Sequence, residues 1–416
     1  MTSVLDVAKQ INRKYKDGKV IVAGDIMPKT PKLKFGSLGA IYPLYGGLPY
    51  GAISVFAGQY SSGKSTAAAL AMAQYQKENP DKTCVYVDVE NTLPIQIDHF
   101  VKMTGLQIDQ EHFVRYDCSG KSAETIFEDI LDLQVGADNI GMIIIDSAAA
   151  LVSDQDLESD FSKDNGMRAS VAKTMGKFIR MMNMHLARKG NILLIINQVR
   201  EAGKTFTGAT IYAEPSGHAL DFYPALKVRF GTRTFTQGDK TDIAASKAED
   251  SDGFRLKFAI TKSKVSPINR GGGFLTFRFN SGIDIINDTL EVAMKYGFIE
   301  RPNNMTYLLI NLDTGEVYQD EEGNDLKFVG KGKLIDYIKT HDEFREKYFD
   351  MLTRHVDGDN STGVSLLDSD SLSEIMDEEE NIESSKKKSK KVQEDLKEIN
   401  KDIAENENKP EENNQE

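Results

Sequence analysis

Hydrophobic positions along the chain follow two spacings, and these predict two kinds of element. Short apolar runs at residues 53–57, 84–87, 142–145 and 192–196 are typical of buried β-strands. Residues 66–73, which follow the first run, have strong helix propensity. Strands that alternate with helices in this way are typical of a largely parallel sheet. The pattern therefore predicts an α/β fold.

The first 35 residues have a different pattern. Apolar residues at helical spacing predict a short amphipathic helix at residues 4–15, with basic side chains on its other side. A segment rich in lysine and proline, residues 23–34, separates this helix from the next element. The helix must dock to bury its apolar stripe, either on its own body or on a neighbouring subunit, and the sequence leaves both open.

A small α/β domain is predicted at residues 284–356, beyond a core at residues 36–283. Its expected elements are a helix at residues 290–298, a hairpin at residues 307–318 and a helix at residues 334–352. These bounds leave the rest of the chain as a C-terminal tail.

The tail, residues 357–416, is acidic. It carries 19 acidic and 8 basic residues, a net charge of −11 out of −13 for the whole chain. It has no aromatic residue and little apolar surface to bury, so we predict that it is disordered. Such a tail either covers a basic surface of the body or only keeps the protein soluble.

Composition excludes several classes of protein. The 416-residue chain has room for two or three domains, and no apolar run approaches the roughly 20 residues that span a bilayer. The N-terminus lacks the basic and apolar regions of a secretory signal, so we expect a cytoplasmic protein. Cys84 and Cys118 are too few for a disulfide framework or a clustered metal site, and we expect buried thiols.

Candidate chemistry begins directly after the first predicted strand. The chain reads Gly58-Gln59-Tyr60-Ser61-Ser62-Gly63-Lys64-Ser65, and Thr66 leads into the helix. A glycine-rich loop between a strand and a helix aims successive backbone N–H groups at phosphate oxygens. Lys64 would reach the terminal phosphates, and Ser65 would offer its hydroxyl to Mg²⁺. The alternative is a glycine turn with a solvated lysine.

Three polar side chains lie at or just past the ends of later strands. Ligands bind at the carboxyl ends of strands in open α/β sheets, so Glu90, Asp146 and Gln198 should converge on the nucleotide. Asp146 would order the hydration shell of Mg²⁺, and Glu90 is the candidate to polarise the attacking water. Gln198 could contact the terminal phosphate and report its presence. Each of the three could instead cap or order a loop.

Together these motifs resemble one family, the RecA-type recombinases of bacteria and their phages. The matching segments are Gly46-Gly47-Leu48-Pro49, Gly58 to Thr66, Asp88-Val89-Glu90, Ile145 to Leu151, Ile196 to Arg200, Gly217 to Tyr223, Lys262-Ser263-Lys264 and Gly330 to Lys333. They occur in the family's order, at nearly its spacing, from about residue 1 to residue 355. The resemblance implies a RecA-type P-loop ATPase core with a mostly parallel twisted sheet, a short N-terminal helical region and a small C-terminal α/β domain.

The resemblance also implies that ATP and Mg²⁺ bind between the subunits of a helical filament. The phosphate loop and Asp146 would come from one subunit, and Lys262 and Lys264 from the next. Without the resemblance, these two lysines look like the solvated face of a strand that runs into a loop. The N-terminal helix would pack on a neighbouring core.

The residue that stacks on the adenine is less well defined. Counted back from Gly105, the family's aromatic position falls on Phe100. About three extra residues lie between Glu90 and Gly105, so His99 is a competing candidate.

Two loops would carry single-stranded DNA, one at about residues 156–168 and one at residues 199–216. The expected contacts are Met167, Arg168, Arg200, Lys204, Phe206, Thr207, Gly208 and Ile211. Basic side chains attract phosphates, and an apolar side chain can wedge between bases. The second loop begins directly after Gln198, so the state of the nucleotide could order or release it. Its ending, Ala213 to Gly217, differs from the threonine-rich stretch of typical members.

A lysine cluster near the last helix is a candidate for duplex DNA. Lys327, Lys331 and Lys333 would form a gateway for incoming duplex by the resemblance, or simply a basic helix start. If it is a gateway, the acidic tail would screen it.

We therefore predict a DNA-dependent ATPase of recombination and DNA repair. It would polymerise on single-stranded DNA, pair it with homologous double-stranded DNA and exchange strands. A hexameric helicase-type motor and a non-recombining regulatory ATPase are the alternatives. The motor would need an N-terminal collar domain and an arginine finger, and the chain offers only one short helix and Lys262 and Lys264 in these places.

Overall fold

The computed structural model describes residues 3–14, 30–158, 167–204, 210–213, 219–238, 240–243, 249–358, 366–368, 371–372 and 375. The chain divides into two units, Met1–Pro31 and Lys32–Glu416. The first unit contains helix α1 (Val4–Asn12), whose start is fixed by a capping box between Ser3 and Asp6. Its apolar residues Val4 and Leu5 are exposed. The amphipathic helix is confirmed, and it ends at Asn12.

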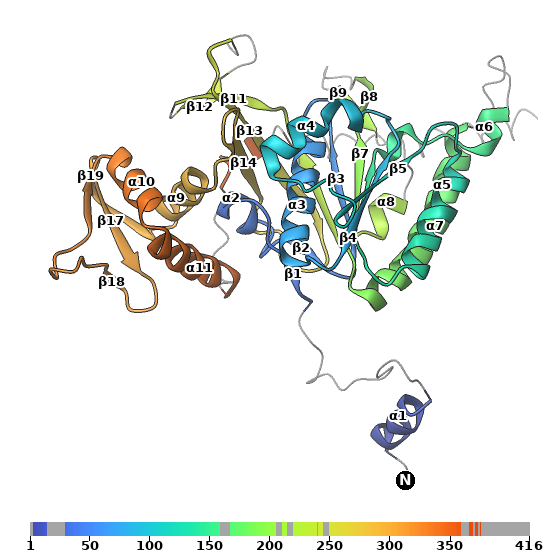
Figure 1. Ribbon diagram of the computed structural model, residues 1–416, viewed down its shortest axis with the longest axis horizontal. Coiled ribbons are helices and arrows are strands. Elements are labelled where there is room, and N and C mark those ends of the chain that lie inside the picture. Colours follow the sequence, from blue (N-terminus) through green and yellow to red (C-terminus); the bar gives the residue numbers. More distant parts are fainter. Residues whose placement is uncertain are drawn as a thin grey trace, which may run out of the picture. The chain divides into compact units, whose positions relative to one another are not determined.

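An 11-stranded sheet organises the second unit (Figure 1). Its main path runs β12-β11-β13-β10-β3-β7-β6-β4-β5, and β14 and β15 continue from β13. The strands are β3 (Ile53–Gly58), β4 (Thr83–Asp88), β5 (Phe113–Asp117), β6 (Ile140–Asp146), β7 (Leu193–Gln198), β10 (Leu226–Phe230), β11 (Thr234–Gln237), β12 (Lys240–Ile243), β13 (Gly253–Ser263), β14 (Gly272–Arg278) and β15 (Gly282–Ile283). Neighbouring strands from β10 to β5 are parallel, and the pairs that involve β11 to β15 are antiparallel. The predicted α/β class with a largely parallel sheet is confirmed.

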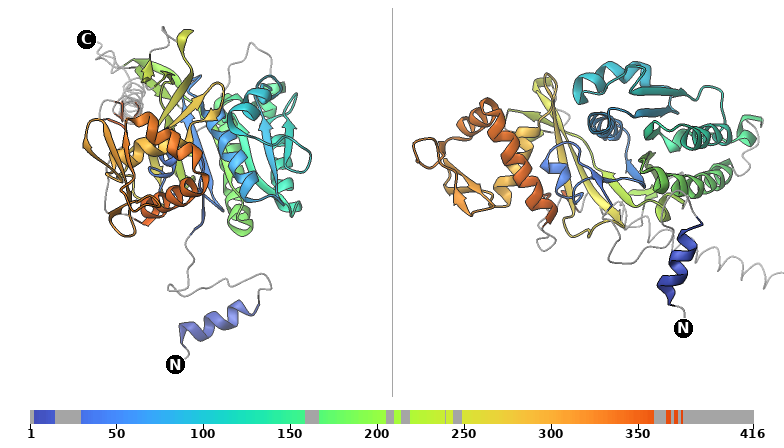
Figure 2. Two further views of the ribbon diagram at one scale, coloured as in Figure 1. Left: turned by 60° about the vertical axis from the view of Figure 1, so that its left-hand side comes forward. Right: turned by 60° about the horizontal axis from the view of Figure 1, so that its bottom comes forward.

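Helices cover both faces of the parallel strands, as the two views of Figure 2 show. One face packs on α3 (Lys64–Glu78) and α4 (Leu93–Thr104), and the other on α5 (Ala123–Gly136) and α7 (Met167–Lys189). Along β3, Phe56 joins the first cluster, whereas Val55 and Ala57 join the second. Burial on both faces explains why these strands are continuous apolar runs in the sequence.

Shorter elements connect these layers. They are β1 (Lys32–Leu33), α2 (Leu38–Ile41), β2 (Leu48–Pro49), the 3₁₀ helix η2 (Ala148–Ala150), α6 (Asp154–Glu158), β8 (Arg200–Lys204), β9 (Thr210–Ala213) and α8 (Ala219–Phe222). Both cysteines are free and buried in the core, as predicted. Burial raises the pKa of the Cys84 and Cys118 thiols to about 12.

A small domain follows the last strand of the sheet. It contains α9 (Ile285–Lys295), β16 (Ile299–Asn303), β17 (Thr306–Asn311), β18 (Glu316–Val317), β19 (Lys327–Val329), α10 (Lys331–Thr340) and α11 (Asp342–Gly358). The predicted hairpin is present as β17 and β18. The single helix predicted at residues 334–352 is wrong. His341 leaves the helical conformation at φ −117° and ψ 76°, and α11 begins at the next residue.

Part of the C-terminal tail is folded against this body. We define the clasp as residues 366–368, 371–372 and 375. Leu366, Leu367 and Ile375 are buried in the cluster that also contains the core of the small domain. Disorder of the whole tail is therefore wrong for the clasp. Its apolar residues supply enough surface to bury, although the composition of the tail as a whole is polar.

Polar contacts and close packing hold the clasp. Lys295 Nζ on α9 donates to the carbonyl of Leu366 at 2.7 Å, and Lys257 Nζ on β13 donates to Ser371 Oγ at 3.3 Å. Ile375 lies over Gly231, where an added Cβ would come within 2.8 Å of its side chain. The clasp thus joins the small domain to the outer strands of the sheet.

Candidate nucleotide site

The loop predicted to bind phosphates joins β3 to α3. Gly63 precedes the helix with φ 82°, and a Cβ there would lie 2.4 Å from a methyl group of Leu256. Only glycine combines this backbone conformation with so little space. Lys64 and Ser65 then occupy the first two positions of α3, where free backbone N–H groups favour anions.

Lys64 is folded back over its own loop. Only 6% of the residue is exposed, and Nζ donates to the carbonyl of Gln59 at 2.6 Å and to Ser62 Oγ at 3.3 Å. Tyr60, at the tip of the loop, is 86% exposed. These contacts give the ammonium group neutral oxygen partners, which phosphate oxygens could replace.

The three polar residues at the strand ends converge, as the parallel register requires. Gly58 lies beside Gln198, and Asp88 lies beside Asp146. Gln198 Nε2 on β7 donates to Glu90 Oε1, and Ser147 Oγ donates to the same oxygen at 2.6 Å. Glu90 is therefore held between the ends of β6 and β7.

Burial sets the charge state of the site. Asp146 is buried, and this raises the pKa of its carboxyl group to about 6, against hydrogen bonds from Tyr86 and Ser65 that lower it. Tyr86 Oη donates to Asp146 Oδ2 at 2.5 Å. Burial also lowers the pKa of Lys64 to about 8, against the opposing attraction of Asp146 and Glu90. Charges that are both buried and poorly solvated are typical of a ligand site.

The donor set fits Mg²⁺ with a polyphosphate. Asp146 and Ser65 supply a carboxylate and a hydroxyl, the hard oxygen ligands that Mg²⁺ prefers. Among the residues that the structure describes, no group of three or more His, Cys, Asp or Glu side chains could hold a metal alone. Two protein ligands suit Mg²⁺, which usually binds one or two protein groups together with substrate phosphates and several waters.

The structure places Phe100, the expected adenine contact, in the core. Phe100 is 2% exposed and packs in the core cluster beneath α4, with its ring 6.5 Å from that of Tyr86. A ring buried in this way offers no face to a base. His99, the competing candidate, lies at the surface. Partial burial of its ring lowers the pKa of the imidazole, and the positive charges of Arg233 and Lys102 lower it further.

Lys262 and Lys264 lie away from the phosphate loop of their own chain. Lys262 is opposite Lys227 near the start of β10, whereas Gly58 lies beside Phe230 at the end of that strand. Lys262 Nζ donates to the carbonyls of Asp221 and Phe222, and Lys264 Nζ to those of Phe222 and Tyr223. Within one chain the two lysines therefore cap α8 and its continuation.

The second predicted DNA loop is a hairpin. β8 and β9 pair in an antiparallel manner, with Arg200 opposite Ala213 and Lys204 opposite Thr210. Ile211 lies on β9, whereas Phe206, Thr207 and Gly208 lie outside the described residues. In the first loop, α6 ends at Glu158 and α7 begins with Met167 and Arg168.

Two contributors to the site were missed in the sequence. Tyr86 fixes the Asp146 carboxylate, and Ser147 fixes Glu90. Ser147 directly follows Asp146 at a strand end, and this position in the sequence could have identified it as a candidate site residue. Tyr86 lies inside an apolar strand, and nothing in its spacing separates it from a core tyrosine.

Comparison with known proteins gives a consistent result. Residues 3–284 match the family described as RecA N-terminal domain. The protein named "Protein RecA" from Mycoplasma pneumoniae is 29% identical over 261 residues, which is 62% of this chain and 70% of that protein. "DNA repair protein recA homolog 3, mitochondrial" from Arabidopsis thaliana is 27% identical over 372 residues, or 87% of this chain and 78% of that protein. Among the described helices, none is long and apolar enough to cross a membrane.

Proposed function

The chain belongs to the RecA family, and we propose that it is a DNA-dependent ATPase that forms a helical filament on single-stranded DNA. In this proposal the filament pairs its strand with homologous double-stranded DNA and exchanges strands, in recombination and repair. The contact between Glu90 and Gln198 carries the proposal. It links the candidate base for hydrolysis to a strand that leads directly into the hairpin of β8 and β9.

Each side chain has a task that follows from its position. When bound, ATP with Mg²⁺ would supply the phosphoryl group to be transferred. Lys64 and Ser65, at the start of α3, would hold the phosphates and the metal, and Asp146 would order the water around the metal. Glu90 accepts a proton from the attacking water.

Gln198 connects the two ligands. Its amide donates to Glu90, and it can turn to a phosphate oxygen instead. Because Arg200 starts β8 only two residues later, movement of Gln198 shifts the base of the hairpin. We propose that single-stranded DNA binds this hairpin through Arg200, Lys204 and its tip, and binds the first loop through Met167 and Arg168.

Lys262 and Lys264 would complete the site from a second subunit. They lie near the start of β10, away from their own phosphate loop, so they suit contact with the ATP of a neighbour. The bonds from their ammonium groups to backbone carbonyls can be exchanged for phosphate oxygens. The exposed apolar residues of α1 suit packing on a neighbouring core in the same assembly.

Electron microscopy with single-stranded DNA and a slowly hydrolysed ATP analogue tests the assembly. We expect open helical filaments that form only when both ligands are present. Closed rings would contradict the proposal and favour a hexameric motor.

Two substitutions test the division of roles. Lys64→Ala should abolish both ATP hydrolysis and the ATP-induced gain in DNA binding, whereas Glu90→Gln should reduce hydrolysis to a small residual rate and keep that gain. Lys77→Ala, on the exposed side of α3, and Glu111→Gln, at an exposed turn, are matched controls. Equal loss of DNA binding in the Lys64 and Glu90 variants would contradict the assigned roles.

A further inference from the structure

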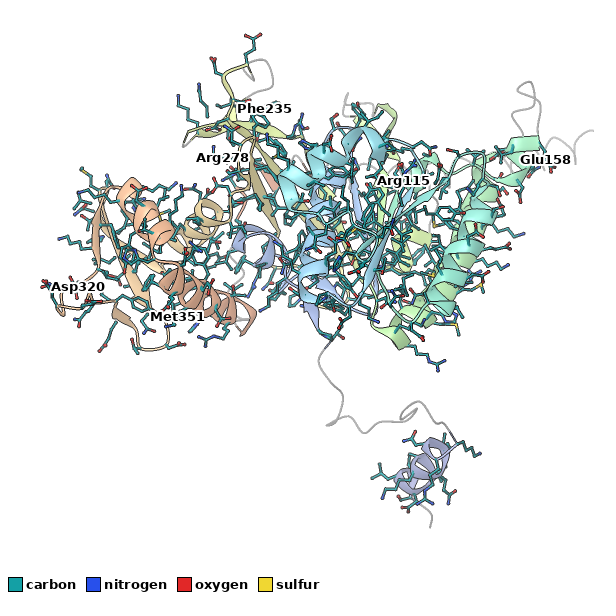
Figure 3. All side chains as sticks on the ribbon, in the orientation of Figure 1. Arg115, Glu158, Phe235, Arg278, Asp320 and Met351 are labelled. Atoms are coloured by element: carbon teal, nitrogen blue, oxygen red, sulfur yellow. The ribbon has the colours of Figure 1, made fainter. Side chains whose placement is uncertain are left out.

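The turn that carries Glu90 is held by an ion pair between two strands, in which Asp88 is buried and Arg115 is half-buried. Asp88, the last residue of β4, is 1% exposed. Arg115 on β5 places two nitrogens, Nε and Nη2, each 2.8 Å from its Oδ2. This two-pronged contact gives both direction and strength, because the guanidinium is a rigid planar fork. Figure 3 labels Arg115 on β5, within the body of the unit.

The same carboxylate also begins the next helix. Asp88 Oδ1 accepts from the backbone N–H of Thr92 at 3.1 Å, and Asp88 Oδ2 accepts from that of Leu93 at 3.2 Å. No side-chain cap comes from Thr92, the residue before α4. Asp88 therefore caps α4 from the strand, and Arg115 fixes the rotamer of Asp88 that does so.

Glu90 lies on the short link between these two fixed points. The backbone N–H groups of Val89 and Glu90 both donate to the carbonyl of Asp146, at 2.8 and 3.2 Å. Asn91 then turns with φ 54°, and its N–H donates to the carbonyl of Asp88. Asp146 holds one side of the turn, and the carboxylate of Asp88 holds the other, so the direction of the Glu90 side chain depends on both.

We propose that Arg115 is a positioning residue for ATP hydrolysis, which acts by holding Asp88 and so the turn that aims Glu90. This inference rests on the proposed role of Glu90. A carboxylate as buried as Asp88 requires a partner, and among the described side chains Arg115 is the only cation that the structure pairs with it. Without Arg115 the carboxylate would turn toward water, and the start of α4 and the turn would lose their common anchor.

The test uses Arg115→Gln, which keeps the length and polarity of the side chain, and Arg115→Lys, which keeps the charge but not the fork. The readouts are kcat and KM for DNA-stimulated ATP hydrolysis by the full-length protein, and the Kd for ATP. We expect Arg115→Gln to lower kcat at least tenfold, while KM and Kd stay within threefold of the wild-type values. Arg115→Lys should recover part of the loss, because one ammonium group can still reach Asp88.

A matched control is Arg345→Ala. Arg345 is similarly half-buried and pairs with Asp342 at 2.6 Å in the small domain, far along the chain from the site. Its kcat should stay within twofold of wild type. An unchanged kcat in folded Arg115→Gln would overturn the inference, and so would equal changes in kcat and in Kd, since these indicate general damage to the site. If Arg115→Gln does not fold, Arg115→Lys provides the test. A kcat and a thermal stability of Arg115→Lys that both equal the wild-type values would overturn the inference.

A double variant separates this inference from the proposed function. If Arg115 acts through Glu90, adding Arg115→Gln to Glu90→Gln should lower the residual rate by less than twofold. A further tenfold loss would show that Arg115 acts on another group. If Glu90→Gln alone hydrolyses ATP normally, the role of Glu90 in the proposed function fails. If Glu90→Gln is inactive and Arg115→Gln is normal, only the positioning role fails.

Discussion

Asp146→Asn should make the protein more stable at neutral pH when no nucleotide or Mg²⁺ is bound. Burial raises the pKa of Asp146 in the folded protein to about 6, whereas the same carboxyl group in an unfolded chain has a pKa of about 3.9. Because the folded-state pKa is the higher one, this group favours folding below about pH 4. That contribution is lost as the pH rises through 6. The ionised carboxylate then destabilises the folded protein, and asparagine does not.

The size of the effect follows from the two pKa values. Between pH 4.5 and pH 7.5, linkage gives a change of about 2 kcal/mol in the wild-type free energy of unfolding relative to that of the variant. The direct effect of the amide on hydrogen bonds from Tyr86 and Ser65 is nearly independent of pH. The pH dependence of the difference is therefore a cleaner measure than the difference at one pH.

Urea unfolding of both proteins in EDTA, at pH 4.5, 6 and 7.5, measures this difference. Asp288→Asn is the matched control, because burial also raises the pKa of Asp288 to about 6, and Asp288 lies against Arg255, away from the phosphate loop. Both variants should gain stability relative to wild type as the pH rises. Only Asp146→Asn should weaken the binding of Mg²⁺ and ATP. If its stability relative to wild type does not change with pH, the carboxylate is not a source of instability and the reasoning from burial fails.

Three other changes probe the clasp, the phosphate loop and the remaining tail. Ile375→Asp should release the clasp, lower the thermal midpoint by a few degrees and expose the clasp to proteolysis, because it buries an unpaired charge; an unchanged proteolytic pattern would show that the clasp does not pack in solution. Gly63→Ala should weaken ATP binding at least tenfold in a fluorescent-analogue titration. Adding Leu256→Ala to this variant should restore only part of the affinity, because the positive φ at residue 63 still costs about 1 kcal/mol. Complete recovery would mean that only the clash with Leu256 matters. Deletion of residues 376–416, which keeps the clasp, should speed the uptake of duplex DNA at low Mg²⁺, and an unchanged rate would contradict screening by the tail.

The residues that meet at the sheet edge of the site could be predicted from the sequence, because a simple rule of parallel sheets determines them. Parallel strands must end at one edge, so the residues that follow β3, β4, β6 and β7 meet there whatever the loops do. This is why Glu90 and Gln198 touch, although 108 positions separate them. The partners on neighbouring strands, such as Arg115, depend on which strands pair and in what register, and a single sequence does not state this.

The burial of Phe100, where an adenine contact is expected, has a geometric explanation. α4 ends at Thr104, and the expected adenine contact is counted back from the next residue, Gly105, which has φ 74°. Each residue along a helix turns the side-chain direction by about 100°. About three extra residues lie between Glu90 and Gly105, and counting back from Gly105 assumes that all of them precede the adenine contact. If some of them follow it, the count selects a residue on another face of the helix. In the structure, Phe100 points into the core and His99 outward.

The clasp was missed because composition averages over a long segment. Residues 357–416 are polar as a whole, but Leu366, Leu367, Leu372 and Ile375 lie within ten positions of one another. Such a group is too small to fold alone, and it is buried only because the outer strands and the small domain offer a surface. Local composition cannot reveal a surface made by distant residues.

The hydrogen bonds of Glu90 suggest how DNA could control hydrolysis. One of its carboxylate oxygens accepts from both Ser147 and Gln198, so in this conformation its capacity to polarise water is partly used. Ser147 is buried at the end of β6 and cannot easily leave. Gln198 is half-buried, and the chain continues from it into β8, the element proposed to bind DNA.

If DNA draws the base of the hairpin and Gln198 away from Glu90, the carboxylate gains a free lone pair while Asp88 and Arg115 keep its turn in place. Stimulation of hydrolysis by DNA would then require both a mobile Gln198 and a fixed Glu90, which is why substitutions of Gln198 should reduce the response to DNA, whereas substitutions of Arg115 should reduce the rate with and without DNA.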